Sequence, residues 1–238
     1  MKTFFLALMC CALSVPATAD DRTAAPFNGK DLSGWKLKGD ASGSYWKVGN
    51  ARLHPDDPKK LTVESGSELI NDKGHTDLGR GVDIYSEFKH GTARIEIEVM
   101  VPKGSNSGVY VHGEYEVQIY DSWGVEKPRT LDIGAIYGAA PPRVNAAKKP
   151  GDWQKLVIDF EAPKFDADGK VTRKARFVKV SLNGQTIHEN VEMKGPTPGG
   201  VTGKEHAKGP IMLQGNHGPV SYRNLKITRM VFQTLQAK

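Results

Sequence analysis

Apolar and polar residues alternate along most of the chain, and this alternation restricts the fold more than any other feature. In the stretch 94–101, Ile95, Ile97, Val99 and Val101 occupy every second position, with mostly charged residues between them. Side chains of a β-strand point to opposite faces in turn, so this stretch is expected to be a strand with one buried face. The stretches 156–160, 178–182 and 225–227 repeat the pattern, and no segment has the spacing of a long amphipathic helix. The sequence therefore predicts a nearly all-β protein.

Turn signals separate the predicted strands. Asn183-Gly184 favours a tight hairpin, and Gly49-Asn50 is a second hairpin candidate. Pro141-Pro142 marks a loop, and the stretch 195–208 has almost no apolar residues, which predicts a long surface loop. Short strands with frequent turns predict a two-sheet jelly-roll sandwich. We find no internal repeat and no break between domains, so residues 20–238 are expected to form a single domain.

The N-terminal residues 1–19 have the pattern of a cleavable signal peptide. Lys2 is followed by an apolar run from 4 to 15 and by the small residues Ala17-Thr18-Ala19. The apolar run is too short for a membrane span. We therefore expect a periplasmic or secreted protein, cleaved near Ala19.

Both cysteines, Cys10 and Cys11, lie inside this leader. Cleavage near Ala19 would leave a mature chain without cysteine, which therefore needs no disulfide. A lipoprotein signal ending at one of the two cysteines is an alternative, although the stretch before them is short for one.

The distribution of charge and the spacing of the histidines argue against a nucleic-acid partner and give no sign of a metal site. The formal net charge is +6, and it is spread along the chain without a basic run, so a nucleic-acid partner is not expected. The seven histidines are scattered, and no pair has metal-ligand spacing. No cofactor or metal is predicted, and no spacing requires a divalent cation.

A row of polar residues follows the turn at Gly113. Glu114, Glu116 and Gln118 alternate with apolar residues and would share one face of a strand. Carboxylates two residues apart on a strand lie roughly 6–7 Å from each other, a separation close to that of glycosidase acid pairs. Amides, acids and aromatic residues together suit sugar hydroxyls and sugar faces. The alternative is that the row is only the solvated face of an outer strand.

A second polar cluster lies in the stretch 209–225. Gln214 precedes a glycine-flanked turn that carries Asn216 and His217, where backbone can approach a ligand closely. His217 alone could equally be an ordinary turn residue. Arg223 and Asn224 could bind loop backbone at a sheet edge.

Phrases distributed over nearly the whole chain resemble the family named for 3-keto-disaccharide hydrolases. They are Phe27–Trp35, Ser107–Tyr110, Tyr115–Ile119, Asp121–Ser122, Gly134–Tyr137, Pro141–Pro142, Gly151–Trp153, Leu182–Gly184, Gly209–Ile211, Leu213–Gln214, His217–Gly218 and Tyr222–Asn224. No single phrase is decisive, and the likeness rests on their order and spacing.

The resemblance implies a concanavalin- or glucanase-like jelly roll and cleavage of 3-keto-glycosides. A separate sugar 3-oxidoreductase would supply such substrates and is the implied functional partner. A ketone at carbon 3 acidifies the hydrogen on carbon 2, so a base can remove it. The enolate can then expel the substituent at carbon 1, and water can add afterwards.

The resemblance also implies site residues. The implied catalytic residues are Glu116, His217 and Asp121, and His112 is a further catalytic candidate at a position where this chain departs from the family. The implied substrate-binding residues are Gln118 and Gln214, and the further candidates for binding are Glu114, Tyr110, Tyr137 and Arg223. Glu116 or His217 is the expected base. His112 stands where family members commonly carry arginine. This difference could weaken charge stabilisation, or His112 itself could act as an acid-base group. Asp121 could instead cap the following loop, and both tyrosines could be core residues.

Two other functions remain open from the sequence. One is a non-catalytic carbohydrate-binding module on the same scaffold, because a fold does not fix a function. The other is an ordinary endo-glycosidase with Glu114 and Glu116 as its acid pair. That pair requires both carboxylates in one cleft.

Overall fold

The structure, a computed structural model, describes residues 22–73 and 81–232. The predicted signal peptide and its two cysteines lie outside the described residues. Apart from one 3-10 turn at Ala41–Gly43, the regular structure of the described part is all β, as the alternation predicts.

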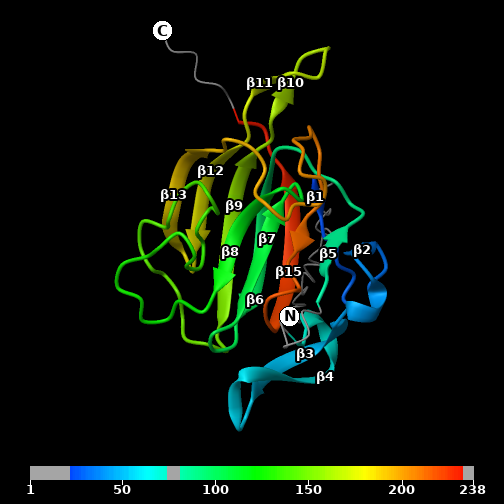
Figure 1. The fold of residues 1–238 in the computed structure, drawn as a ribbon, viewed down its shortest axis with the longest axis vertical. Coiled ribbons are helices and arrows are strands. Elements are labelled where there is room, and N and C mark those ends of the chain that lie inside the picture. The colour runs from blue at the N-terminus through cyan, green and yellow to red at the C-terminus, as the bar shows by residue number, and fades with distance from the viewer. Residues whose placement is uncertain (1–21, 74–80, 233–238) are drawn as a thin grey trace, which may run out of the picture.

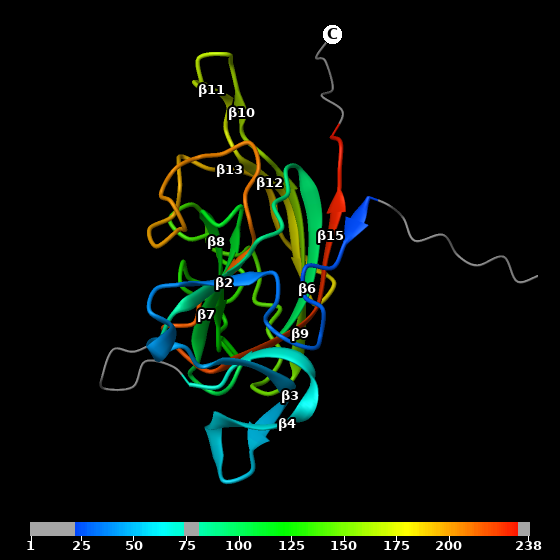
Figure 2. The same cartoon turned by 90° about the vertical axis from the view of Figure 1, so that its right-hand side faces the viewer.

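The strands form two layers, which Figure 2 shows from the side. The larger sheet has the order β13-β12-β9-β6-β15-β4-β3, with β1 added beside β15. Its strands are β1 Thr23–Ala24, β3 Trp46–His54, β4 Asp57–Asn71, β6 Ala93–Met100, β9 Trp153–Glu161, β12 Arg176–Leu182, β13 Gln185–Glu192 and β15 Val220–Arg229.

The smaller sheet lies in front of the larger one in Figure 1 and has the order β2-β5-β14-β7-β8. Its strands are β2 Trp35–Lys38, β5 Asp83–Ser86, β14 Met212–Leu213, β7 Asn106–Val111 and β8 Tyr115–Tyr120. A separate two-stranded ribbon pairs β10 Lys164–Phe165 with β11 Val171–Arg173. The predicted two-sheet jelly-roll sandwich is confirmed.

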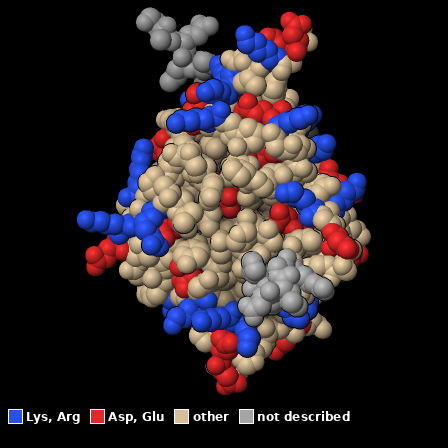
Figure 3. Space-filling model, viewed as in Figure 1, with Lys and Arg blue, Asp and Glu red and all other residues tan. Residues whose placement is uncertain are grey.

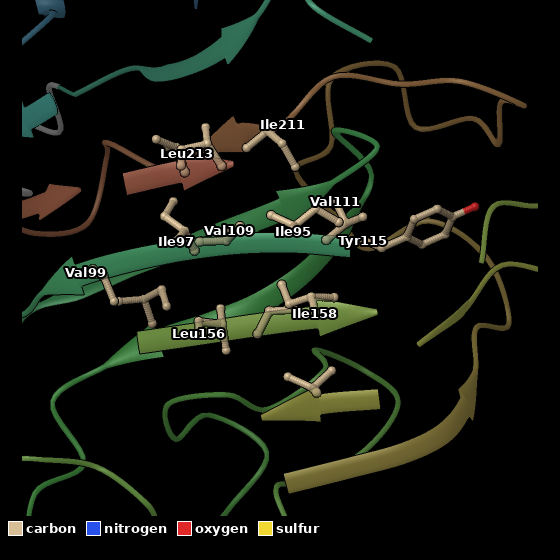
Figure 4. Packing of buried hydrophobic residues seen from close by; sticks show 14 of the residues in the cluster. Ile95, Ile97, Val99, Val109, Val111, Tyr115, Leu156, Ile158, Ile211 and Leu213 are labelled. Carbon is tan, nitrogen blue, oxygen red and sulfur yellow. The ribbon is translucent and has the colours of Figure 1, made fainter. Parts of the chain in front are cut away.

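The core lies between the two sheets. Ile95, Ile97 and Val99 of β6 point inward, as their spacing predicts, and are at most 1% exposed. Figure 4 shows them facing apolar residues of the smaller sheet, including Val109 and Leu213. Because side chains alternate, the residues next to these on each strand lie on the outer faces. The polar row on β8 is therefore on the outer face of the smaller sheet.

One of the two predicted hairpins forms. Asn183 and Gly184 connect β12 to β13 with φ angles of 51° and 85°, so that prediction is confirmed. The prediction at Gly49-Asn50 is wrong, because β3 runs straight through both residues. A Cβ at Gly49 would lie 2.6 Å from the carbonyl oxygen of Glu64. Glycine is used there for close approach of two strands at a register shift and not for a turn.

The stretch predicted as a long surface loop contains no strand, since β13 ends at Glu192 and β14 begins at Met212. Part of it crosses the outer face of the smaller sheet, where Thr197 N donates to Glu114 O and Val201 N to Gly113 O. We call residues 197–203 the strap. Among the described residues there is no helix long and apolar enough to cross a membrane.

Candidate active site

The outer face of the smaller sheet carries a polar row that runs across its strands. Lys38 on β2 pairs with Asp83 on β5, and Gly108 on β7 pairs with Gln118 on β8. Gln214 follows β14 directly, and its N–H donates to Gly108 O at 2.9 Å. Cross-strand neighbours share a face, so the row lies on one side of the sheet.

A pocket of about 410 Å³ lies over this row. It brings together six of the residues predicted from the sequence: Tyr110, Glu116, Gln118, Tyr137, Gln214 and His217. These residues come from the stretches 107–110 and 115–119, from the loop at 134–137 and from the polar cluster at 209–225. The pocket also contains Lys38 and Asp83, which sequence reasoning missed.

Glu116 lies at the floor of the pocket and is 3% exposed. The hydroxyl of Tyr110, opposite it on β7, donates to Glu116 Oε2 at 2.9 Å. Burial raises the pKa of Glu116 to about 7, and the Tyr110 hydrogen bond opposes that increase. Such a carboxyl group exchanges protons near neutral pH, which a general base requires.

A glycine makes room for this carboxyl group. A Cβ on Gly108 would lie 2.4 Å from Glu116 Oε1, closer than any real contact. The carboxyl group therefore lies directly over the backbone of β7. Gly108 belongs to the phrase Ser107–Tyr110, but the sequence alone does not reveal which side chain its missing Cβ accommodates.

Lys38 and Asp83 add opposite charges at the other end of the row. The ammonium of Lys38 donates to the carbonyl of Gly199 in the strap, and its Nζ lies 3.7 Å from Asp83 Oδ2. Asp83 Oδ1 accepts from Gly215 N at 3.0 Å. Burial raises the pKa of Asp83, against the opposing effect of that hydrogen bond and of Lys38.

The amides and the rim complete the pocket. Gln118 Nε2 donates to Asn106 Oδ1 at 2.8 Å, which orients the Gln118 amide. Tyr137 N donates to Glu116 O, so this loop residue is tied to β8. Tyr137 is 37% exposed and Leu131, which also lines the pocket, is 54% exposed. These exposed apolar groups offer a surface for a ligand with apolar faces.

His217 lines the same pocket on an exposed turn, and its Nδ1 contacts the Oδ1 of Asn216. Glu116 and His217, the two residues expected as base, therefore share one site. A catalytic pair on different faces of the molecule would have contradicted that expectation.

The structure does not bring Glu114 to this pocket. Glu114 precedes β8 and is 1% exposed. Its Oε1 accepts from Thr202 N and Thr202 Oγ1, both at 2.8 Å, and its Oε2 accepts from Gly203 N at 2.9 Å. The carboxylate binds the strap and lines a different hollow from Glu116. The acid pair of an endo-glycosidase is therefore not assembled.

His112 is also placed away from the pocket, because the turn between β7 and β8 directs it into the core. It is 1% exposed and has a φ of 56°. Its ring packs against His90 and Phe160, with centroids 4.8 Å and 4.9 Å away. Burial, followed by the neighbouring His90, lowers its pKa to about 3. An acid-base role near neutral pH is not available to such a group.

Asp121 and Arg223 lie outside the pocket as well. Asp121 accepts from Gly104 N at 2.9 Å and from Trp123 N at 3.3 Å, which is the loop-capping role. Arg223 belongs to β15 of the larger sheet and stacks on Trp153, with its Cζ 3.9 Å from the ring centroid. Arg223 is close to His217 in the sequence but lies away from the pocket in the structure, because β15 belongs to the larger sheet.

Within the described residues, no group of three or more histidine, cysteine, aspartate or glutamate side chains could hold a metal ion.

Figure 3 shows the face that carries the smaller sheet. Its centre is largely uncharged with a few recessed acidic atoms, while lysine and arginine side chains gather around the edge. A pocket of carboxylates, amides and tyrosines suits sugar hydroxyls and sugar faces, and on a sheet of a sandwich it indicates the class of carbohydrate-acting proteins.

Comparison with known proteins agrees with this class and narrows it. The chain belongs to the 3-keto-alpha-glucoside-1,2-lyase-like domain family, whose sequence pattern matches residues 23–228. A proposed glycosyl hydrolase of Parabacteroides distasonis ATCC 8503 has a similar structure, with 28% identity and a TM-score of 0.65 over 88% of this chain and 84% of that one. A second proposed glycosyl hydrolase of the same organism has 16% identity and a TM-score of 0.59, covering 90% and 98% of the two chains. Comparison with curated proteins finds no match.

Proposed function

We propose that the protein cleaves 3-keto-glycosides, with Glu116 as the base that removes the hydrogen on carbon 2. The observation that carries the proposal is a carboxyl group at the floor of a polar pocket with a pKa raised to about 7. A ketone next to carbon 2 makes that hydrogen acidic enough for a single carboxylate, so no second acid pair is needed. Family membership and the resemblance of two proposed glycosyl hydrolases support a carbohydrate substrate.

The electron pair released from carbon 2 moves onto the keto oxygen as an enolate. Lys38 supplies positive charge and Gln118 and Gln214 supply hydrogen bonds for the sugar oxygens. The bond between carbon 1 and its oxygen then breaks, and His217 gives the departing oxygen a proton. Water adds across the resulting double bond to complete hydrolysis.

The substrate of this reaction must be oxidised beforehand, so a sugar 3-oxidoreductase acts upstream. The predicted signal peptide assigns the reaction to the periplasm or the exterior of the cell. Both statements belong to the proposal and are tested by fractionation of the native host and by coupling the two activities.

The decisive experiment compares a 3-keto-disaccharide with its unoxidised parent, using chromatography to follow monosaccharide release. We expect release from the keto form only, and its loss in Glu116→Gln. Glu96→Gln is the matched control, because Glu96 lies on the larger sheet and pairs with Lys155 at 3.5 Å. Turnover of the parent would instead indicate an ordinary glycosidase.

A purely binding function makes a different prediction. A carbohydrate-binding module would bind both sugars without release, and Glu116→Gln would leave that binding unchanged. The exposed Tyr137 and Leu131 at the rim are the features that favour this second candidate. Calorimetry of both sugars alongside the release assay separates the two functions.

A further inference from the structure

A second hollow, of about 490 Å³, lies on the outer face of the larger sheet, the side away from the candidate active site. It forms where β3 and β4 bend against β15. A small apolar cluster separate from the core, with Ala51, Ile70 and Met100 at its centre, supports it. Trp153 packs on this cluster and lines the hollow. The larger sheet thus has an apolar floor on a face that is otherwise solvated.

Glu68 and Arg223 face each other at this hollow without forming a hydrogen bond. Glu68 is buried, and its Oε2 accepts from Ala51 N at 2.8 Å and from Ser221 Oγ at 2.9 Å. Its other oxygen, Oε1, lies 4.0 Å from Arg223 Nη1, which is too far for a hydrogen bond. Arg223 is held in place by Glu98 at 2.7 Å and by stacking on Trp153.

Another ion pair on the outer face of the larger sheet, between β6 and β9, shows full pairing. Arg94 and Asp159 form two hydrogen bonds, at 2.7 Å and 2.8 Å. The gap between Glu68 and Arg223 is therefore a local feature of the hollow. A hydroxyl group between them could donate to the carboxylate and accept from the guanidinium at the same time.

An irregular segment of β4 builds the wall. The pairing of β3 with β4 shifts between Gly49 and Asn50, which leaves residues 65–67 outside the ladder. Asn50 Oδ1 accepts from Ser67 N at 3.2 Å, and a Cβ on Gly66 would lie 2.0 Å from the Asn50 amide. The Asn50 side chain is thus fixed over Gly66 and lines the hollow, where its amide can serve as a further hydrogen-bonding group. Bulges often turn side chains toward binding sites.

The charged side chains around the hollow indicate which class of ligand it can bind. Arg223 faces Glu68 and Glu98, so the two carboxylates balance it and Arg52 at the edge. An anion would meet a carboxylate, and a cation would meet a guanidinium. A neutral molecule with neighbouring hydroxyl groups and an apolar face suits the donors, the acceptor and the apolar floor together.

We propose that this hollow is a second saccharide-binding site, which holds a neutral sugar through Glu68, Arg223 and Asn50 and takes no part in cleavage. Such a site would keep the protein on a glycan while the pocket on the other sheet acts. It is independent of the proposed function, because binding here needs neither the keto group nor Glu116.

The test is a titration of the isotope-labelled protein with maltose, cellobiose and trehalose, followed by NMR. We expect the Ser67 amide and the Trp153 indole to shift on addition of at least one sugar. Arg223→Met should weaken this binding at least ~10-fold, the effect of about one charge-assisted hydrogen bond. Glu116→Gln should leave it unchanged.

Asn50→Ala keeps the test decisive should Arg223→Met fail to fold, because Asn50 is exposed. Asn50→Ala should weaken sugar binding, followed by the same NMR shifts, several-fold. Lys155→Met, on the same face of the larger sheet, should leave that binding unchanged. Absence of shifts at Ser67 and Trp153 with all three sugars would overturn the proposal. So would shifts that neither variant weakens.

Discussion

The carboxyl group of Glu116 is under two opposing influences that differ in origin. Burial raises its pKa to about 7, and the Tyr110 hydroxyl lowers it by donating to the ionised form. If Glu116 acts as the base, kcat/KM should rise with pH through about 7, because only the ionised carboxylate accepts a proton. Tyr110→Phe removes the opposing hydrogen bond and should move this rise to higher pH.

The check is a pH profile of kcat/KM for the wild type and Tyr110→Phe with a 3-keto-disaccharide. Tyr45→Phe is the matched control, since Tyr45 contacts Lys73 away from the pocket. A profile that stays at the same pH in Tyr110→Phe would show that another group limits the rate.

Gly108 offers a steric test of the same residue. Its Cβ would lie 2.4 Å from Glu116 Oε1 and 3.1 Å from Cδ, so in Gly108→Ala the carboxyl group must move. We expect kcat to fall by ~100-fold, the cost of a catalytic group misplaced by about 1 Å. Gly195→Ala is the control, because nothing lies within 4 Å of that Cβ. A melting temperature that falls while kcat persists would contradict this account.

The residue types of the pocket were predictable in part. Glu116, Gln118 and Gln214 stand out because polar residues alternate with apolar ones on strands. Lys38 and Asp83 follow the same alternation, but β2 and β5 are short and far along the chain from β7. Only the strand order brings them to the site. His112 lies between the two phrases that supply Tyr110 and Glu116, but its side chain points into the core, because the backbone of the turn has a left-handed φ at this residue.

At the scale of elements, the strap connects the active site to Glu114. Three donors from the strap converge on this buried carboxylate, and the strap carries the carbonyl of Gly199 to Lys38. A Cβ on Gly200 would lie 2.2 Å from Glu114 Oε2, so the packing is close. We infer that Glu114 positions the strap and does not touch the substrate.

Glu114→Ala should therefore loosen one wall of the pocket. We expect KM to rise ~10-fold, while the pH at which kcat/KM rises stays unchanged, because Glu116 keeps its surroundings. Thr202 and Gly203 are exposed, so water can replace their lost acceptor, and the lost hydrogen bonds should cost about 0.5–1.5 kcal/mol of folding free energy. Glu192→Ala, on the exposed end of β13, is the control. A shifted pH profile with KM unchanged would assign Glu114 to the chemistry instead.

Which strands form was largely predictable, and how they pair was not. Alternation identifies strands locally, whereas β14 (Met212–Leu213) lies between β5 (Asp83–Ser86) and β7 (Asn106–Val111), although it comes much later in the chain than both. No local pattern encodes such pairing. The wrong hairpin at Gly49-Asn50 has a similar cause, because a glycine serves a turn or a close approach equally well and only the partner strand decides.

At the scale of the whole molecule, the free energy of unfolding depends on pH through buried groups whose effects have opposite signs. His90 and His112 are buried against each other, and burial lowers their pKa values to about 4 and about 3. Both histidines bind a proton more readily in the unfolded chain. Their contribution to the free energy of unfolding is therefore complete above about pH 6.5 and is lost as the pH falls. Glu116 acts in reverse, because its raised pKa favours the folded state at lower pH.

A comparison of variants separates these effects. His112→Asn tolerates the left-handed backbone and removes one titrating group, whereas Glu116 remains in both proteins. Between pH 7 and pH 4.5, the wild type should lose more unfolding free energy than His112→Asn, by a few kcal/mol. Denaturant titrations at each pH provide the measurement. Parallel pH dependence in the two proteins would mean that His112 is protonated in the folded state, with the core open to water around the turn between β7 and β8.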